Sequence, residues 1–166
     1  MFRAAVEDDL EVLKRDVKAA VDRSFELELA DQADDVHSIF IALDAQGAVL
    51  GSGFIHWRGP RDPAALALFP DAPEIFRVEV RQAHRSRGIG GRLIQAMEAC
   101  VRVRGYRQVG LGVAHANPDA YRLYRKLGYL DTQLSEYYDE YQYPVAGGGY
   151  ATARDLCRYL AKSLVK

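Results

Sequence analysis

A glycine-rich turn between a predicted strand and a predicted helix constrains this sequence more than any other feature. The turn reads Arg85-Ser-Arg-Gly-Ile-Gly-Gly91; it follows a predicted strand over 74–81 and precedes a helix that ends at Gly105. Glycines let a ligand approach the backbone closely, and the unpaired N–H groups at a helix start carry partial positive charge. The pattern predicts a phosphate-binding turn, unless the glycines only connect the strand to the helix.

Two common phosphate motifs do not fit this turn. A P-loop needs the dipeptide Gly-Lys followed by Ser or Thr, and the turn contains no Gly-Lys. A dinucleotide fingerprint that starts at Gly88 needs a glycine at position 93, where the chain has Leu93. The remaining functional interpretation is a pyrophosphate site for a different cofactor.

The rest of the chain alternates strands and helices, which predicts one α/β domain over the 166 residues. Strands are predicted over 2–5, 38–43, 48–57, 74–81, 108–113 and 129–135. Helices are predicted over 8–29, from Ile89 to Gly105 and from Pro118 to Gly128, with one helical turn over 64–69. The segment 155–163 fits either a helix or a strand, because Leu156, Leu160 and Leu164 recur every four residues.

Charge and composition exclude several classes of protein. The net charge of −1, from 22 basic and 23 acidic residues, disfavours nucleic acid as a partner. No apolar run is long enough for a membrane span, and residues 1–10 turn acidic at once, without the apolar stretch that is typical of a secretory signal. The scattered histidines and the lone Cys100 and Cys157 lack metal-ligand spacing. We expect a cytoplasmic protein with no metal, no membrane and no nucleic acid.

Two motifs in register resemble one enzyme family. The stretch from Val80 through Arg85-Ser-Arg-Gly-Ile-Gly-Gly-Arg-Leu93 looks like the acetyl-CoA signature of the GNAT-type N-acetyltransferases. Downstream, Leu111-Gly-Val113, Asn117-Pro-Asp-Ala120 and Leu123-Tyr-Arg-Lys-Leu-Gly-Tyr129 are similar to a second segment of that family.

The resemblance implies a single GNAT domain over 1–166. Its fold is α/β (α+β): a mixed, mostly antiparallel sheet of six to seven strands, with helices on both faces. The fourth and fifth strands, here 74–81 and 107–113, splay apart, so their backbone can pair with the cofactor's pantetheine amides. The resemblance also favours a strand over 155–163.

The resemblance implies acetyl-CoA as cosubstrate and a set of cofactor-binding residues. The backbone of Val78, Glu79 and Val80 contacts the pantetheine arm, and the turn holds the pyrophosphate. Asn117 matches an asparagine beside the arm and is also a good helix N-cap. The full expected set is Val78, Glu79, Val80, Arg85, Ser86, Arg87, Gly88, Ile89, Gly90, Gly91, Asn117 and Tyr124.

The implied reaction is direct attack of a neutral amine on the thioester. Tyr124 matches the tyrosine that protonates the leaving thiolate, with Tyr121 as a stand-in, and a phenol suits this role because it stays protonated at pH 7. Some relatives carry a glutamate where this chain has Gly112, so we expect Glu79, Glu74 or ordered water to take the amine's proton.

The predicted acceptor surface is the loop that follows the sixth strand. It contains tyrosines and carboxylates, namely Tyr137, Tyr138, Tyr141, Tyr143, Glu136, Asp139 and Glu140, and His56 and Trp57 are further candidates to line the cleft. Aromatic faces and carboxylates suit a small cationic amine. The alternatives are a protein N-terminus or lysine as acceptor, or a non-catalytic acyl-CoA-binding module, in a monomer or homodimer.

Overall fold

The computed structural model describes residues 1–17, 32, 34–134, 136–145 and 148–165. Within these residues eight strands form one sheet, in the order β1-β2-β3-β4-β5-β8-β6, with β7 paired to β8. The strands are β1 (Phe2–Ala4), β2 (His37–Leu43), β3 (Val49–His56), β4 (Glu74–Val80), β5 (Gln108–Ala114), β6 (Leu130–Asp131), β7 (Tyr137–Pro144) and β8 (Tyr150–Ser163). The described α-helices are α1 (Leu10–Asp16), α3 (Pro63–Leu68), α4 (Ile89–Val103) and α5 (Pro118–Lys126).

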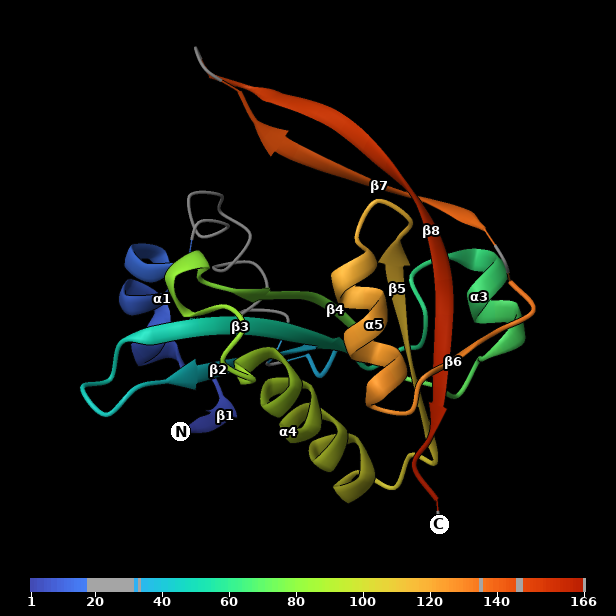
Figure 1. Cartoon of the computed structure of the whole chain (residues 1–166), viewed down its shortest axis with the longest axis horizontal. Coiled ribbons are helices and arrows are strands. Elements are labelled where there is room, and N and C mark those ends of the chain that lie inside the picture. Colours follow the sequence, from blue (N-terminus) through green and yellow to red (C-terminus); the bar gives the residue numbers. More distant parts are fainter. Residues whose placement is uncertain (18–31, 33, 135, 146–147, 166) are drawn as a thin grey trace.

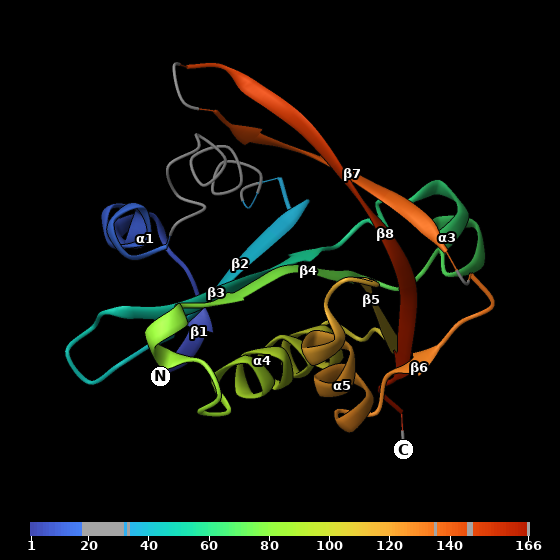
Figure 2. The same ribbon diagram turned by 45° about the horizontal axis from the view of Figure 1, so that its top comes forward.

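The sheet is mixed and mostly antiparallel, as expected. Every pair of neighbouring strands runs antiparallel except β4 and β5, which are parallel. Figures 1 and 2 show α1 on one face of the sheet and α4 and α5 on the other. The predicted GNAT-like architecture is therefore confirmed, although the sheet has eight strands among the described residues rather than the expected six to seven.

Alternation along the strands builds a core on each face. On the α1 face, Leu13 of the helix packs with Ile39, Ile41 and Phe76. On the other face, a larger cluster joins the strands to the buried sides of α4 and α5. It includes Ile75, Leu111, Val113, Leu93, Met97 and Tyr124.

Several predicted elements have different bounds in the structure. The predicted helix over 8–29 begins as a single turn at Glu7–Asp9 and continues as α1, while 18–29 lies outside the described residues. The strand predicted over 129–135 is reduced to β6.

The largest correction concerns the end of the chain, from Tyr137 onward. The tyrosine-rich segment predicted as a loop is the strand β7, which pairs with β8 from Tyr137↔Cys157 to Pro144↔Tyr150. β8 confirms a strand for 155–163: a spacing of four residues also satisfies the two-residue period of a strand, and pairing with β5 decides the outcome. Figure 1 shows that β7 and the first half of β8 form an arm that projects from the sheet.

Candidate functional site

The candidate site begins where the two parallel strands part. β4 and β5 pair only at Glu74↔Gly110 and Ile75↔Leu111. Beyond these residues the strands run in different directions, as Figure 1 shows. Val78, Glu79 and Val80, predicted to contact the cofactor, lie on the diverging half of β4 and keep pairing only with β3 there. The expected splay is therefore present, and it leaves one backbone edge of β4 without a strand partner.

A bulge redirects β4 within this half. Ser52 of β3 pairs with Glu79 and Phe54 pairs with Phe76, so one strand has an extra residue between the two pairs. Arg77, with φ of 47°, takes up the irregularity. Val78 and Val80 then face α4, while Glu79 faces the opposite side.

The glycine-rich turn has the backbone geometry of an anion site. Ser86 and Gly88 have φ values of 60° and 75°, and Gly88 is the N-cap residue of α4. The first N–H groups of this helix have no partners within the helix and point out of its N-terminus. A Cβ atom at Gly90 would lie 3.6 Å from the nearest side-chain atoms, an ordinary contact. Internal packing therefore does not require glycine at position 90. Because Gly90 has no side chain, its backbone is open to a ligand.

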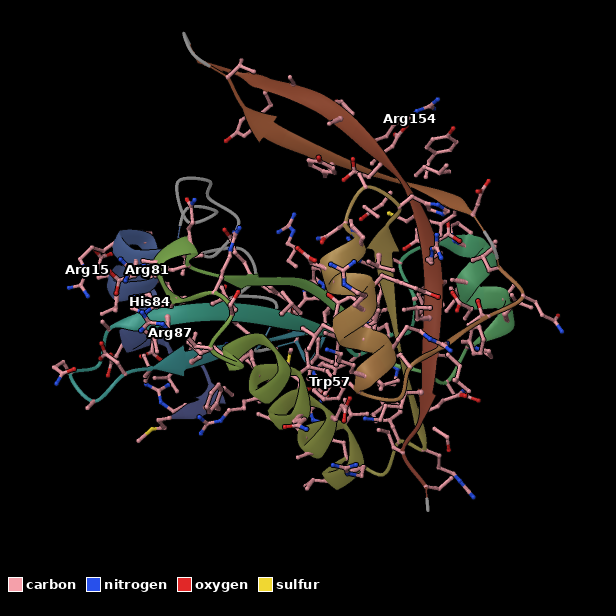
Figure 3. The ribbon with its side chains drawn as sticks, in the orientation of Figure 1. Arg15, Trp57, Arg81, His84, Arg87 and Arg154 are labelled. Carbon is pink, nitrogen blue, oxygen red and sulfur yellow. The ribbon has the colours of Figure 1, made fainter. Side chains whose placement is uncertain are left out.

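Basic side chains surround the turn. Figure 3 labels Arg81, His84 and Arg87 on and around the turn. The Asp16 carboxylate of α1 contacts Arg15 at 2.9 Å and Arg81 at 3.7 Å, so it joins α1 to the residue that follows β4. A hollow of about 330 Å³ lies between α1 and the turn. Its lining residues are Asp16, Val17, Gly51, Glu79, Arg81, Gln82 and Arg85. The Arg85 Nε donates to the carbonyl of Val80 at 2.9 Å, which ties the turn to the free half of β4.

The two predicted proton acceptors lie at opposite ends of β4. Glu79 is half-buried and lines the hollow beside the turn. Glu74 lies where β4 and β5 part, is 1% exposed, and accepts hydrogen bonds from the backbone N–H and the Nε of Arg61 at 3.0 and 2.9 Å. Burial raises the pKa of the Glu74 carboxyl, and the Arg61 guanidinium opposes that rise. Four strand residues lie between Glu74 and Glu79, so the two carboxylates do not form one site.

Tyr124 projects from α5 into the core beside the diverging strands. It is 8% exposed, its ring packs against Tyr129 with centroids 6.0 Å apart, and burial raises its pKa to about 12. The stand-in Tyr121 is engaged elsewhere, because its hydroxyl donates to Asp131 at 2.8 Å. Asn117 is the N-cap of α5, its side chain accepting from the N–H of Ala120 at 3.1 Å.

The predicted acceptor residues are split between two faces. Strand alternation turns Tyr137 and Asp139 of β7 inward, while Tyr138 and Glu140 are exposed. Asp139 lies 3.6 Å from Arg61, an ion pair that joins β7 to the segment before α3. The prediction that Asp139 and Glu140 belong to one acceptor surface is therefore wrong.

His56 and Trp57 also separate, since they follow one another at the end of β3. His56 pairs in register with Glu74 and lies on the α1 face, and its Nδ1 is 2.6 Å from the carbonyl of Gly59. Trp57 is 5% exposed in the opposite core, where its Nε1 donates to Ser38. The prediction that Trp57 lines the acceptor cleft is wrong.

Arg61 is a residue of the candidate site that sequence reasoning missed. It lies in a proline-rich connection with no motif around it, yet it contacts both Glu74 and Asp139 and stacks over Phe76 at 4.4 Å. Only the tertiary fold brings these groups together.

A second hollow in the described part of the chain is lined by none of the predicted site residues. A hollow of about 440 Å³ lies between the end of α3 and strands β6 and β8. No group of three or more described His, Cys, Asp or Glu side chains is arranged to hold a metal ion. Of the helices that the structure describes, none has the length and apolar character needed to cross a membrane.

Comparisons with known proteins agree with this geometry. The sequence model of the acetyltransferase (GNAT) family matches residues 6–129. No curated protein sequence matches the chain.

Solved structures share the fold at low sequence identity. A ribosomal-protein-alanine N-acetyltransferase from Brucella melitensis is 21% identical, with a TM-score of 0.70 and 99% of each chain covered. A phosphinothricin acetyltransferase from Sinorhizobium meliloti, in complex with AcCoA, is 20% identical with a TM-score of 0.70, covering 99% of this chain and 88% of that one. A spermidine/spermine N-acetyltransferase from Vibrio cholerae is 18% identical with a TM-score of 0.67, covering 98% and 91%.

Proposed function

Because the chain belongs to the acetyltransferase (GNAT) family, we propose that it transfers an acetyl group from acetyl-CoA to the primary amine of a small cationic molecule. The observation that carries the proposal is the parting of β4 and β5 after Ile75 and Leu111, next to the glycine-rich start of α4 and the buried Tyr124.

The residues of the turn and of β4 fit the donor. The N–H groups at the start of α4 and the nearby Arg85 and Arg87 suit a pyrophosphate. The free edge of β4 at Val78–Val80 suits the amides of a pantetheine arm, since both partners need hydrogen bonds in that position. When bound, acetyl-CoA supplies an activated acyl group, the thioester.

Transfer then needs positioning and charge stabilisation rather than a covalent enzyme intermediate. The amine lone pair forms the new C–N bond, the C–S bond breaks, and the proton lost by the amine ends on the thiol. Backbone N–H groups of β4 polarise the carbonyl, and the Tyr124 hydroxyl donates a hydrogen bond to the departing sulfur. Tyr124 remains protonated throughout, because burial raises its pKa to about 12.

The amine itself must be neutral to attack. Glu74 is the better placed of the two predicted bases, because it lies at the point where the strands part, and burial raises its pKa toward that of a base. Glu79 lies beside the phosphate-binding turn and suits a role near the cofactor.

A cationic acceptor is favoured by the charges near this point. Glu74 and Asp139 lie on either side of Arg61, so the two carboxylates outnumber the one guanidinium. A protein N-terminus or lysine is the second candidate, and it is favoured by the fold shared with a ribosomal-protein-alanine N-acetyltransferase.

Thiol release from acetyl-CoA tests the proposal. We expect release that depends on an added amine, faster for small polyamines than for neutral or acidic amines. Activity on peptides alone would favour the second candidate. Tight CoA binding without turnover on any amine or peptide would instead indicate a non-catalytic acyl-CoA-binding module.

A further inference from the structure

Two glycines leave one face of β5 without side chains at the point where it parts from β4. Gly110 and Gly112 are two residues apart, so their side-chain positions lie on the same face of the strand. Their neighbours Leu111 and Val113 point the other way, into the core beneath α4 and α5. Gly110 pairs in register with Glu74, so the bare face is also the face of the Glu74 carboxylate.

Two tyrosine hydroxyls occupy the space that these glycines leave empty. A Cβ atom at Gly112 would overlap the hydroxyl of Tyr137, and one at Gly110 would overlap the hydroxyl of Tyr159. The two rings meet edge to face, with centroids 6.3 Å apart. Tyr137 comes from β7 and Tyr159 from β8, so the C-terminal hairpin supplies the polar groups that β5 lacks.

The two hydroxyls differ in accessibility. Tyr159 is fully buried, stacks on Phe69, and its hydroxyl has no hydrogen-bond partner among the described residues. Tyr137 is only partly buried, and its hydroxyl is not among the buried side-chain atoms that lack a hydrogen-bond partner. Burial and the nearby Glu74 raise the pKa of both phenols, which therefore keep their protons at neutral pH.

The site lies on the face opposite Tyr124. Tyr124 belongs to the cluster beneath α4 and α5, whereas Gly112, Tyr137 and Glu74 lie on the α1 face. If the thioester is held between the diverging strands, Tyr124 contacts its sulfur from one face of the sheet and the acceptor amine approaches from the other face.

We propose that Tyr137 is the acceptor-binding residue of this enzyme, its hydroxyl taking the place of a β5 side chain above Gly112 and accepting a hydrogen bond from the acceptor's amino group. This inference rests on the proposed acetyl transfer. The hydroxyl does not remove the amine's proton; it holds the nitrogen near Glu74 with its lone pair toward the thioester. Tyr159 supports the ring of Tyr137 from beneath.

The geometry is testable without any activity. Gly112→Ala should lower the melting temperature, because its methyl group overlaps the Tyr137 hydroxyl. Tyr137→Phe should restore most of that loss, since the next ring atom is 3.2 Å from the new Cβ. Gly110→Ala is the matched control: Tyr159→Phe should not rescue it, because ring atoms of Tyr159 already lie within 2.7 Å of a Cβ there. Failure of Tyr137→Phe to rescue Gly112→Ala would overturn the proposed placement.

The role is tested by steady-state kinetics. Tyr137→Phe should lower kcat/KM for the amine by about 2- to 13-fold, as expected for one lost hydrogen bond to a neutral amine, and leave the KM for acetyl-CoA unchanged. Tyr138→Phe, on the exposed side of β7, should change neither value. An active wild type with an unaltered Tyr137→Phe variant would overturn the inference alone. A wild type that binds CoA but acetylates no amine would overturn the proposed function and this inference together.

Discussion

Replacing Tyr124 by Phe removes one hydroxyl and leaves the packing of the ring intact. The side chain is 8% exposed and its ring contacts Tyr129, so a phenylalanine fills the same space and the fold should persist. The change therefore isolates the contribution of the hydroxyl to the reaction.

The size of the effect follows from the pKa of this phenol. Full proton transfer from a group with a pKa of about 12 to a thiolate with a pKa of about 8.5 is uphill by about 5 kcal/mol. The hydroxyl therefore acts by donating a hydrogen bond to the developing thiolate. A hydrogen bond to a charged group contributes about 1.5–3 kcal/mol, so kcat should fall by about 10- to 150-fold.

The assay is single-turnover acetyl transfer at saturating acetyl-CoA, which reports the chemical step rather than product release. Tyr121→Phe is the matched control, since the Tyr121 hydroxyl is bonded to Asp131, and its rate should match the wild type. The pH profiles of wild type and Tyr124→Phe should run parallel between about pH 6 and 9, because the phenol titrates well above this range. A rate within about threefold of wild type, or an alkaline limb below pH 10 that disappears in Tyr124→Phe, would refute the reasoning.

Three further predictions concern the cofactor, the acceptor and stability. At about 100 times its Kd, CoA should stabilise the protein by about 2.7 kcal/mol, or about 5–11 °C in melting temperature for a chain of this size. Gly90→Val should abolish this shift, while the melting temperature of the unliganded variant stays close to that of the wild type. An undiminished shift in the variant would place the pyrophosphate elsewhere. Asp139→Lys should raise the KM of a cationic amine at least about threefold through local repulsion, whereas Glu140→Lys on the outward face should not; equal effects would remove the distinction between the faces. Hydrogen bonds from Arg15 and from the backbone N–H of Val49, with the charges of Arg15 and Arg81, lower the pKa of Asp16 to about 2 despite partial desolvation. The wild type should therefore be more stable than Asp16→Asn above about pH 4, and this difference in stability should vanish as the pH falls toward 2. A difference that persists at pH 2 would contradict the prediction.

Local chemistry made the phosphate-binding turn and its helix predictable. Glycine at the left-handed N-cap position and apolar spacing after it are properties of neighbouring residues, and α4 begins at Ile89 and ends before Gly105 as expected. The resemblance added the splay of β4 and β5, which no local pattern encodes.

The acceptor side was harder to predict, since long-range strand pairing decides it. The tyrosines of β7 looked like loop residues until pairing with β8 placed Tyr137 over Gly112. Arg61 meets Glu74 only through the tertiary fold. One error was avoidable. His56 and Trp57 both lie in the strand predicted over 48–57, and adjacent strand residues point to opposite faces, so the two side chains do not share a surface.

The central claim is that the gap between β4 and β5 holds acetyl-CoA, with Tyr124 at the sulfur. A crystal structure with CoA tests it most directly. We expect the pyrophosphate on the N–H groups at the start of α4, the pantetheine along Val78–Val80, and the sulfur within hydrogen-bond distance of the Tyr124 hydroxyl. Pyrophosphate bound away from Gly88–Gly91, or a sulfur out of reach of Tyr124, would contradict the claim.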